Sequence, residues 1–205
     1  MPSRSLSAAT AAPRHRDTVR VSPYEVAMAG DTAATAAPRT KQQLLSLSRR
    51  AERRQLAGRE GDLVLVALQH ARFYTARTRA IYAQVAAAGA TVVVFGAGLP
   101  TDLSGPAASR VATVGIAEDD LLADEWLVIF CSARSRWGFL SRDLAAGLPD
   151  ARSAPRTPAA ENSGFDPEKL MLWADLKDPV WLERAAAVLL TRVPELAASV
   201  PWLSR

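Results

Sequence analysis

The stretch Leu63-Val-Leu-Val-Ala-Leu-Gln69 decides the fold, because its almost unbroken run of apolar residues predicts a strand that is covered on both faces. A second run, Thr91-Val-Val-Val-Phe95, is rich in β-branched residues and also has the length of a strand. Between the two runs the sequence predicts a helix over Arg77–Ala88, followed by Gly89 as its C-terminal cap. This strand–helix–strand spacing favours parallel neighbouring strands joined by a right-handed crossover.

Further elements flank this unit on both sides. Thr40 is placed to cap a helix that runs to Leu56, with Leu44 and Leu45 on its apolar face. The remaining patterns predict strands over Arg110–Ile116, Glu125–Cys131 and Lys169–Ala174, a short helix over Trp137–Ala145 and an amphipathic helix over Val180–Val193. Together these elements predict an α/β protein, a three-layer α-β-α sandwich with a mixed sheet of about five strands.

The length of 205 residues suits one domain with tails. We expect the folded domain to span residues 40–195, with a Pro-, Ser- and Ala-rich flexible insertion over 151–164 and a C-terminal tail over 196–205. Residues 1–39 are rich in Ala, Pro and Arg and poor in large apolar side chains, which predicts a disordered tail. Within that tail, Val19–Met28 has enough apolar residues to dock transiently.

The composition also bears on where the chain works. Cys131 is the only cysteine, which excludes an intrachain disulfide and fits a reducing compartment. No apolar run approaches the roughly 18 to 20 residues that a membrane-spanning helix needs, and the N-terminus lacks the order of a secretory signal. We therefore expect a cytoplasmic protein with no membrane contact.

Groups that carry out catalysis are scarce in this sequence. The only histidines are His15 and His70, so Cys/His zinc patterns are impossible. His70 follows the first predicted strand, where it either bonds a nearby carbonyl or, in an alternative hypothesis, works with an acidic neighbour as the base of an unrecognised enzyme. No Gly-x-Ser-x-Gly elbow accompanies it, and we expect a non-enzymatic protein.

Two loops resemble cofactor or metal sites only in part. Gly96-Ala-Gly-Leu-Pro-Thr101 follows a strand as a dinucleotide-binding loop does, but it lacks the third glycine and Pro100 interrupts the start of a helix. We interpret it as a turn that needs positive φ and predict no cofactor. The acidic stretch Glu118–Glu125 lacks the alternating ligand spacing of a calcium loop and predicts a solvated turn without a metal.

The basic run Arg49–Arg54 is the one candidate for a nucleic-acid surface, and the chain carries a formal charge of +4. It lacks a helix-turn-helix companion and interleaved aromatic residues, so direct binding of nucleic acid is not expected. A DNA-associated transcriptional regulator that acts through this run remains an alternative hypothesis.

Three segments together resemble a known family. They are Leu68-Gln-His-Ala-Arg-Phe-Tyr-Thr-Ala-Arg-Thr78, Val93-Val-Phe-Gly-Ala-Gly-Leu-Pro100 and Asp120-Leu-Leu-Ala-Asp-Glu-Trp-Leu-Val-Ile129. In this order they resemble the DICT domain, a sensory domain of diguanylate cyclases and two-component systems, over roughly Thr40 to Val193. The resemblance implies a bacterial signalling module that binds a small ligand or a partner protein. Such modules are usually joined to a cyclase, a kinase or a DNA-binding domain, and because this chain has none of their motifs, we expect a separate output protein.

We expect the sensing surface at the ends of the predicted strands, where ligands collect in open α/β sheets. Arg72 would pair with a ligand anion or, equally, with Glu125 in an internal ion pair that braces the sheet. The aromatic side chains would stack on the ligand. The predicted ligand-binding residues are Arg72, Phe73, Tyr74, Gly96, Gly98, Asp124, Glu125 and Trp126.

Overall fold

The computed structural model describes residues 21–30, 35–55, 59–105, 111–133, 135–144 and 166–197. The strands are β1 (Ala37–Thr40), β2 (Leu63–His70), β3 (Thr91–Ala97), β4 (Ala112–Ile116), β5 (Glu125–Cys131), β6 (Arg136–Asp143) and β7 (Leu170–Leu176). The helices are α1 (Pro23–Met28), α2 (Lys41–Gln55), α3 (Ala76–Ala87), α5 (Pro179–Leu190) and α6 (Pro194–Ala197), with short 3-10 turns η2 (Ala71–Phe73) and η4 (Leu121–Asp124).

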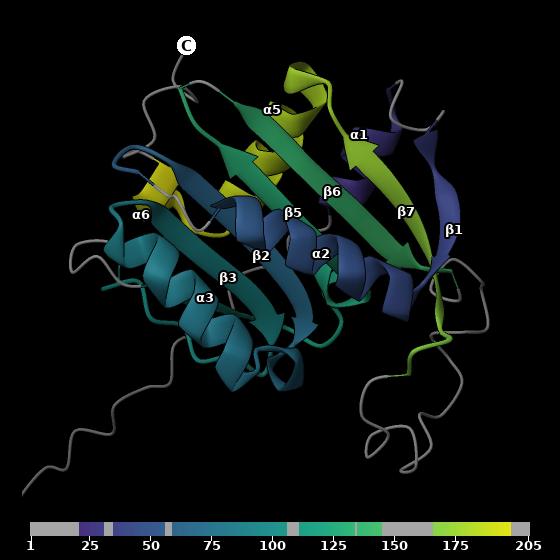
Figure 1. Ribbon diagram of the computed structural model, residues 1–205, viewed down its shortest axis with the longest axis horizontal. Helices are drawn as coiled ribbons and strands as arrows, with labels where there is room; N and C mark the ends of the chain where they lie inside the picture. The colour runs from purple at the N-terminus through teal and green to yellow at the C-terminus, as the bar shows by residue number, and fades with distance from the viewer. Residues whose placement is uncertain are drawn as a thin grey trace, which may run out of the picture.

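The described strands form one seven-stranded sheet in the order β1-β7-β6-β5-β2-β3-β4 (Figure 1). Strand β3 is parallel to both of its neighbours, β2 and β4, whereas the pairs β2–β5, β5–β6, β6–β7 and β7–β1 are antiparallel. The predicted fold class, an α/β protein with a mixed sheet, is therefore confirmed, and the sheet has seven strands instead of about five. The parallel pairing of β2 with β3 across α3 confirms the predicted strand–helix–strand unit.

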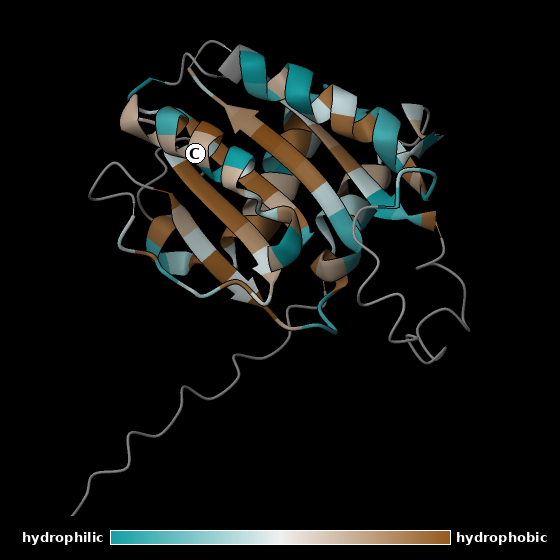
Figure 2. Cartoon of the chain, turned by 60° about the horizontal axis from the view of Figure 1, so that its bottom comes forward, coloured by the Kyte–Doolittle hydropathy of each residue, from teal (hydrophilic) through white to brown (hydrophobic). Residues whose placement is uncertain are grey.

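Helices cover both faces of the sheet, which gives the predicted three layers (Figure 1). On one face, α1, α5 and α6 pack on a core that includes Leu65, Ile129 and Leu140. On the other, α2 and α3 pack on a core that includes Val66 and Val128. The central strands are apolar along their length while the outer helices carry the hydrophilic side chains (Figure 2). Burial on both faces explains why β2 and β5 lack the alternation of a half-exposed strand.

Local signals in the sequence explain where helices α2 and α3 begin and end. The Thr40 hydroxyl accepts from the Gln43 N–H at 3.3 Å, and the Gln43 carboxamide accepts from the Thr40 N–H at 3.1 Å, which is a reciprocal capping box. At the start of α3, the Thr75 hydroxyl accepts from the Thr78 N–H at 3.3 Å and caps the helix from one side only. After α3, Gly89 has a φ of 100°, as predicted for a residue that ends the helix in the left-handed region.

The short helix predicted over Trp137–Ala145 is wrong, because this segment forms strand β6. Its side chains alternate with a period of two: Phe139 packs on the α2 side of the sheet and Leu140 on the α5 side. Gly138 lies opposite Ile129 of β5 where the two strands approach closely. Trp137 and Phe139 therefore lie on the same face of a strand.

Two elements lie in the segment for which disorder is predicted. Helix α1 is anchored by Pro23, Tyr24 and Ala27, which are buried against α5 and the sheet. Strand β1 pairs with β7, and Pro38 lies opposite Leu172 at that edge of the sheet. The disorder predicted for the residues of β1 is thus wrong, because pairing with β7 orders them. Pro23–Met28, part of the stretch for which transient docking is predicted, forms the ordered helix α1, which apolar contacts hold against the core. Residues 1–20 and the predicted insertion over 151–164 lie outside the described residues.

The C-terminal boundary also differs slightly from the prediction. Pro194 begins α6 after α5 has ended, and Leu196 of α6 is buried in the core, so packing continues past residue 195. Within the described part of the chain, none of the helices combines the length and the apolar character that a membrane crossing requires.

Candidate functional site

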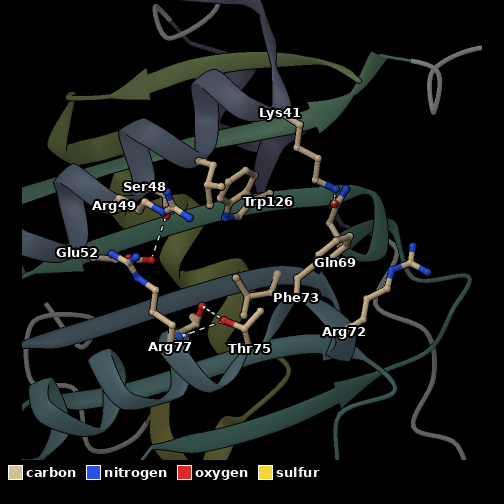
Figure 3. A pocket seen from close by; sticks show the side chains of 13 residues that line it. Lys41, Ser48, Arg49, Glu52, Gln69, Arg72, Phe73, Thr75, Arg77 and Trp126 are labelled. Atoms are coloured by element: carbon tan, nitrogen blue, oxygen red, sulfur yellow. Dashed lines mark hydrogen bonds between the residues drawn. The ribbon is translucent and has the colours of Figure 1, made fainter. Parts of the chain in front are cut away.

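A cavity of about 390 Å³ lies between helix α2, the end of β2, the η2 turn, the start of α3 and the start of β5 (Figure 3). This volume is within the range of about 300–1,000 Å³ that small-molecule pockets occupy. We call it the α2–α3 cavity; its lining residues are Lys41, Leu45, Ser48, Arg49, Glu52, Leu68, Gln69, Arg72, Phe73, Thr75, Arg77, Thr78 and Trp126.

Helix α2 presents one mostly polar face to this cavity. Lys41, Leu45, Ser48 and Glu52 are spaced by three or four residues, so they share one side of the helix. Three of them are polar and yet buried, since only 6% of Lys41, 3% of Ser48 and 8% of Glu52 is exposed. A helix face that only packs on a core would be apolar. These buried polar side chains therefore indicate a binding site on this face of α2.

Gln69 enters the cavity through an unusual backbone conformation. Side chains alternate along a strand, so Gln69 would normally point away from the face that Leu68 occupies. A φ of 64° and a shift in the β2–β3 register between Ala67 and His70 place both side chains on the cavity. The Gln69 carboxamide accepts from Lys41 Nζ at 3.1 Å and donates to the Asp124 carbonyl at 3.2 Å. Non-glycine residues held in this region of φ are concentrated at functional sites.

Lys41 is a buried cation at one end of the cavity. Its ammonium nitrogen lies 4.0 Å from the centre of the Phe73 ring, a cation–π contact, besides its bond to Gln69. Burial, together with the nearby charges of Lys169 and Arg72, lowers the pKa of Lys41 to about 8, against the opposing effect of Asp143 and Asp166. The fold therefore holds this charge at a cost in stability, which is a common property of groups that bind ligands.

Glu52 lies at the other end, next to Arg77 in the view of Figure 3. The Ser48 hydroxyl donates to its carboxylate at 3.2 Å. Burial raises the pKa of Glu52, while the Ser48 hydrogen bond and the charges of Arg77 and Arg49 oppose that rise. The acid and the two guanidinium groups form a charged rim around a cavity whose centre is apolar.

Trp126 forms part of that apolar centre. It is 7% exposed, pairs with Leu68 in the β2–β5 register and meets the Phe139 ring edge-on at 6.0 Å between centres. Its indole N–H is buried and has no hydrogen-bond acceptor among the described residues. A buried donor without an acceptor is unusual in a folded protein and calls for an explanation.

The structure brings three of the eight predicted ligand-binding residues into this cavity: Arg72, Phe73 and Trp126. Arg72 is exposed, and its guanidinium lies 5.1 Å from the centre of the Phe73 ring. Arg72 and Phe73 belong to the η2 turn that follows β2, and Trp126 lies near the start of β5, which the antiparallel pairing puts beside the end of β2.

Glu125 lies on the opposite face of the sheet from Trp126, as the alternation of a strand requires. It is fully buried: the Ser22 hydroxyl donates to one carboxylate oxygen and the Tyr24 N–H donates to the other at 3.2 Å. Burial raises the pKa of Glu125 to about 7, against the lowering effect of these bonds. The Glu125 side chain thus anchors α1 to the sheet. The predicted ion pair between Arg72 and Glu125 is therefore wrong.

The other predicted residues do not line the cavity. The Asp124 carbonyl serves as acceptor for Gln69. Tyr74 is half-buried, with the Arg79 guanidinium 5.7 Å from its ring centre. Gly98 has a φ of 75°, which confirms the interpretation of its loop as a turn that needs positive φ, and Gly96 is packed against Leu99 and His70.

His70 and the acidic stretch Glu118–Glu125 are the remaining candidates from the sequence, and both make specific contacts. His70 Nδ1 lies 3.5 Å from the Glu118 carboxylate, and its ring meets Phe73 edge-on. In the acidic stretch, Asp120 caps η4 and forms a buried ion pair with Arg192 at 2.8 Å. Among the described residues no group of three or more His, Cys, Asp or Glu side chains is arranged to hold a metal.

A second, smaller cavity of about 280 Å³ lies on the other flank of α2. It is lined by Leu47, Arg50, Ala51, Trp137, Phe139, Trp173, Asp175 and Lys177. Arg49 and Arg50 therefore line different cavities on the two flanks of α2.

Sequence reasoning missed the whole contribution of α2 and that of Gln69. A signal for α2 was present: Lys41, Ser48 and Glu52 share the helix side that also carries Leu45. Polar residues that interrupt an apolar stripe at helical spacing indicate a buried polar face. No comparable signal exists for Gln69, because its position depends on a local backbone conformation.

Comparison with known families gives one match. The model of the DICT family, described as the sensory domain in diguanylate cyclases and two-component systems, matches residues 21–141, which is more than half of the chain. The chain therefore belongs to the DICT family of sensory domains. The match begins at α1 and ends in β6, whereas the segments recognised in the sequence suggested roughly residues 40 to 193. Comparison with curated proteins and with solved structures finds no match.

Proposed function

We propose that this protein is a non-enzymatic sensor, which binds a small molecule in the α2–α3 cavity and relays the signal to a separate output protein in the cytoplasm. Membership of a family of sensory domains supports the sensing role. The observation that carries the assignment to this cavity is its set of buried polar groups, above all Lys41 and the unpaired indole N–H of Trp126. Burial of the Lys41 charge and of the Trp126 donor costs free energy, and a ligand that bonds to these groups would offset part of that cost.

The position of the cavity supports a relay as well. Its walls belong to two helices, α2 and α3, and to the strand ends beneath them. A ligand that contacts both helices would bind better to one relative position of α2 and α3 than to another, and this differential binding is what a signal requires. The exposed side of α2, with Arg50 and Arg53, would then present a changed surface to the output protein.

Ligand binding is tested by the melting temperature of the full chain in the presence of a metabolite panel, with two variants of α2. Leu45→Trp fills the α2–α3 cavity, and Leu47→Trp is the matched control because Leu47 is equally half-buried but lines the second cavity. We expect a metabolite to raise the melting temperature of the wild type and of Leu47→Trp but not of Leu45→Trp. A ligand that stabilises Leu45→Trp equally well would place binding elsewhere, and a panel without any effect would contradict small-molecule sensing.

The relay is tested with the same ligand and a signalling protein encoded next to this one. A relay requires that the affinity between the two proteins changes when the ligand is added, because each binding event then biases the other. Equal affinities with and without the ligand would contradict the relay while leaving ligand binding intact.

A further inference from the structure

The α2–α3 cavity carries more positive than negative charge. Lys41, Arg49, Arg72 and Arg77 line it, against the single acid Glu52, whose pKa is raised by burial. In Figure 3, Lys41 and Arg72 lie at one end and Arg49 and Arg77 at the other. Charges that line a partly enclosed cavity are screened less than charges on an open surface, so the cavity attracts anions.

The middle of the cavity is apolar and partly aromatic. Leu45, Leu68, Phe73 and Trp126 form it, and the view in Figure 3 shows Phe73 and Trp126 between the two charged ends. Flat apolar molecules pack well on such a surface because aromatic side chains offer a large contact area. The unpaired N–H of Trp126 adds one requirement, which is a hydrogen-bond acceptor on the molecule bound there.

Lys41 is the best-placed group to bind a negative charge. Its ammonium nitrogen is held by Gln69 at 3.1 Å and by the Phe73 ring at 4.0 Å, so its position is defined before any ligand arrives. Only 6% of the residue is exposed, and hydrogen bonds to a charged group are stronger where water is excluded.

We propose that the α2–α3 cavity binds a small organic anion with a flat apolar body. The acidic group faces Lys41, the body lies over Leu68 and Phe73, and an acceptor atom receives the Trp126 indole N–H. This inference rests on the proposed function and specifies the chemical class of its ligand.

The test uses the indole N–H resonance of Trp126 in the full-length protein labelled with nitrogen-15, assigned by its loss in Trp126→Phe. The probes are three matched series whose flat bodies carry a hydrogen-bond acceptor: 4-acetylbenzoate, 4-acetylbenzamide and 4-acetylbenzylamine; quinoline-6-carboxylate, quinoline-6-carboxamide and 6-(aminomethyl)quinoline; and 6-methoxy-2-naphthoate, 6-methoxy-2-naphthamide and 6-methoxy-2-naphthylmethylamine. We expect the carboxylates to shift the resonance downfield and to saturate it, with dissociation constants at least about tenfold below those of the amides, because a charge-assisted hydrogen bond replaces a neutral one. The amines should bind most weakly.

Two variants assign the discrimination to one residue. Lys41→Met should reduce the preference for carboxylate over amide to less than about threefold, since the neutral amides lose little by this change. Lys177→Met is the matched control, because it removes the same charge from the second cavity and should leave the preference intact.

Each outcome decides something different. Carboxylates, amides and amines that bind equally would overturn the ligand class and leave small-molecule sensing standing. A preference that survives in Lys41→Met would overturn the placement of the acidic group. A Trp126 resonance that no probe moves would overturn this inference, and the metabolite panel with Leu45→Trp would then decide independently whether the cavity senses another class of molecule.

Discussion

Replacement of Glu125 by glutamine should change how stability depends on pH. Glu125 is fully buried and fastens α1 to the sheet through the Ser22 hydroxyl and the Tyr24 N–H. Burial raises its pKa from 4.5 to about 7, although both bonds and the nearby Arg142 and Arg192 favour the charged form. Glutamine has the same shape and cannot ionise, so Glu125→Gln isolates the effect of the charge.

The size and sign of the effect follow from linkage. The folded chain retains the Glu125 proton up to pH about 7, whereas the unfolded chain releases it near 4.5, so the folded state binds more protons between these values. The contribution of Glu125 to the free energy of unfolding is therefore largest below pH about 4.5, and it decreases as the pH rises to 7. At about 1.4 kcal/mol per pKa unit, the total fall is about 3 kcal/mol.

The measurement is urea denaturation of the wild type and of Glu125→Gln from pH 4 to pH 8. The stability of the variant relative to the wild type should rise by about 3 kcal/mol across this range, with most of the rise between pH 4.5 and 7. Glu168→Gln, which changes an exposed acid, serves as the surface control. A difference between the wild type and Glu125→Gln that stays constant within about 1 kcal/mol would refute the argument that burial dominates at this carboxylate.

Three further outcomes test the packing. Cys131 is 1% exposed and burial raises its pKa to about 12, so its thiol should react with Ellman's reagent only after denaturation; a rapid reaction in the native protein would contradict its burial. Arg192→Met should lower the free energy of unfolding by about 3 kcal/mol because it leaves Asp120 as a buried charge without its ion pair, and Asp120→Asn in addition should recover part of that loss. Gly138→Ala should destabilise by about 1–3 kcal/mol in urea titrations, since the new methyl group would lie 2.9 Å from the Val128 carbonyl oxygen; unchanged stability would show that β5 and β6 can separate there.

The elements that could be predicted from the sequence are those whose pattern has a single physical meaning. Strands β2, β3 and β5 are continuous apolar runs, and both faces of these strands are indeed covered. Strand β6 was missed because its aromatic and small residues alternate over only a few positions. Helix α1 was missed because six residues in an Ala-rich segment carry little periodic signal, and its stability comes from tertiary contacts such as that of Ser22 with Glu125.

The same distinction applies to the candidate site. It was predictable that the end of β2 and the start of β5 lie together, and this arrangement places Phe73 and Trp126 in one cavity. That Glu125 and Trp126 face opposite sides follows from the two-residue period of a strand, but the sequence prediction grouped them by proximity along the chain. The side chain of Gln69 depends on one residue with φ of 64°, and no residue-level pattern predicts that conformation for glutamine.

Strand β1 has a consequence for how this domain meets other proteins. A terminal strand normally exposes a row of N–H and C=O groups that can recruit a strand from another molecule. Here the outermost strand has four residues, and Pro38 within it has no N–H to donate. Extension of the sheet into a neighbouring chain is thereby discouraged at this margin, and at the opposite margin the bridge between Asp102 and Thr113 covers part of β4.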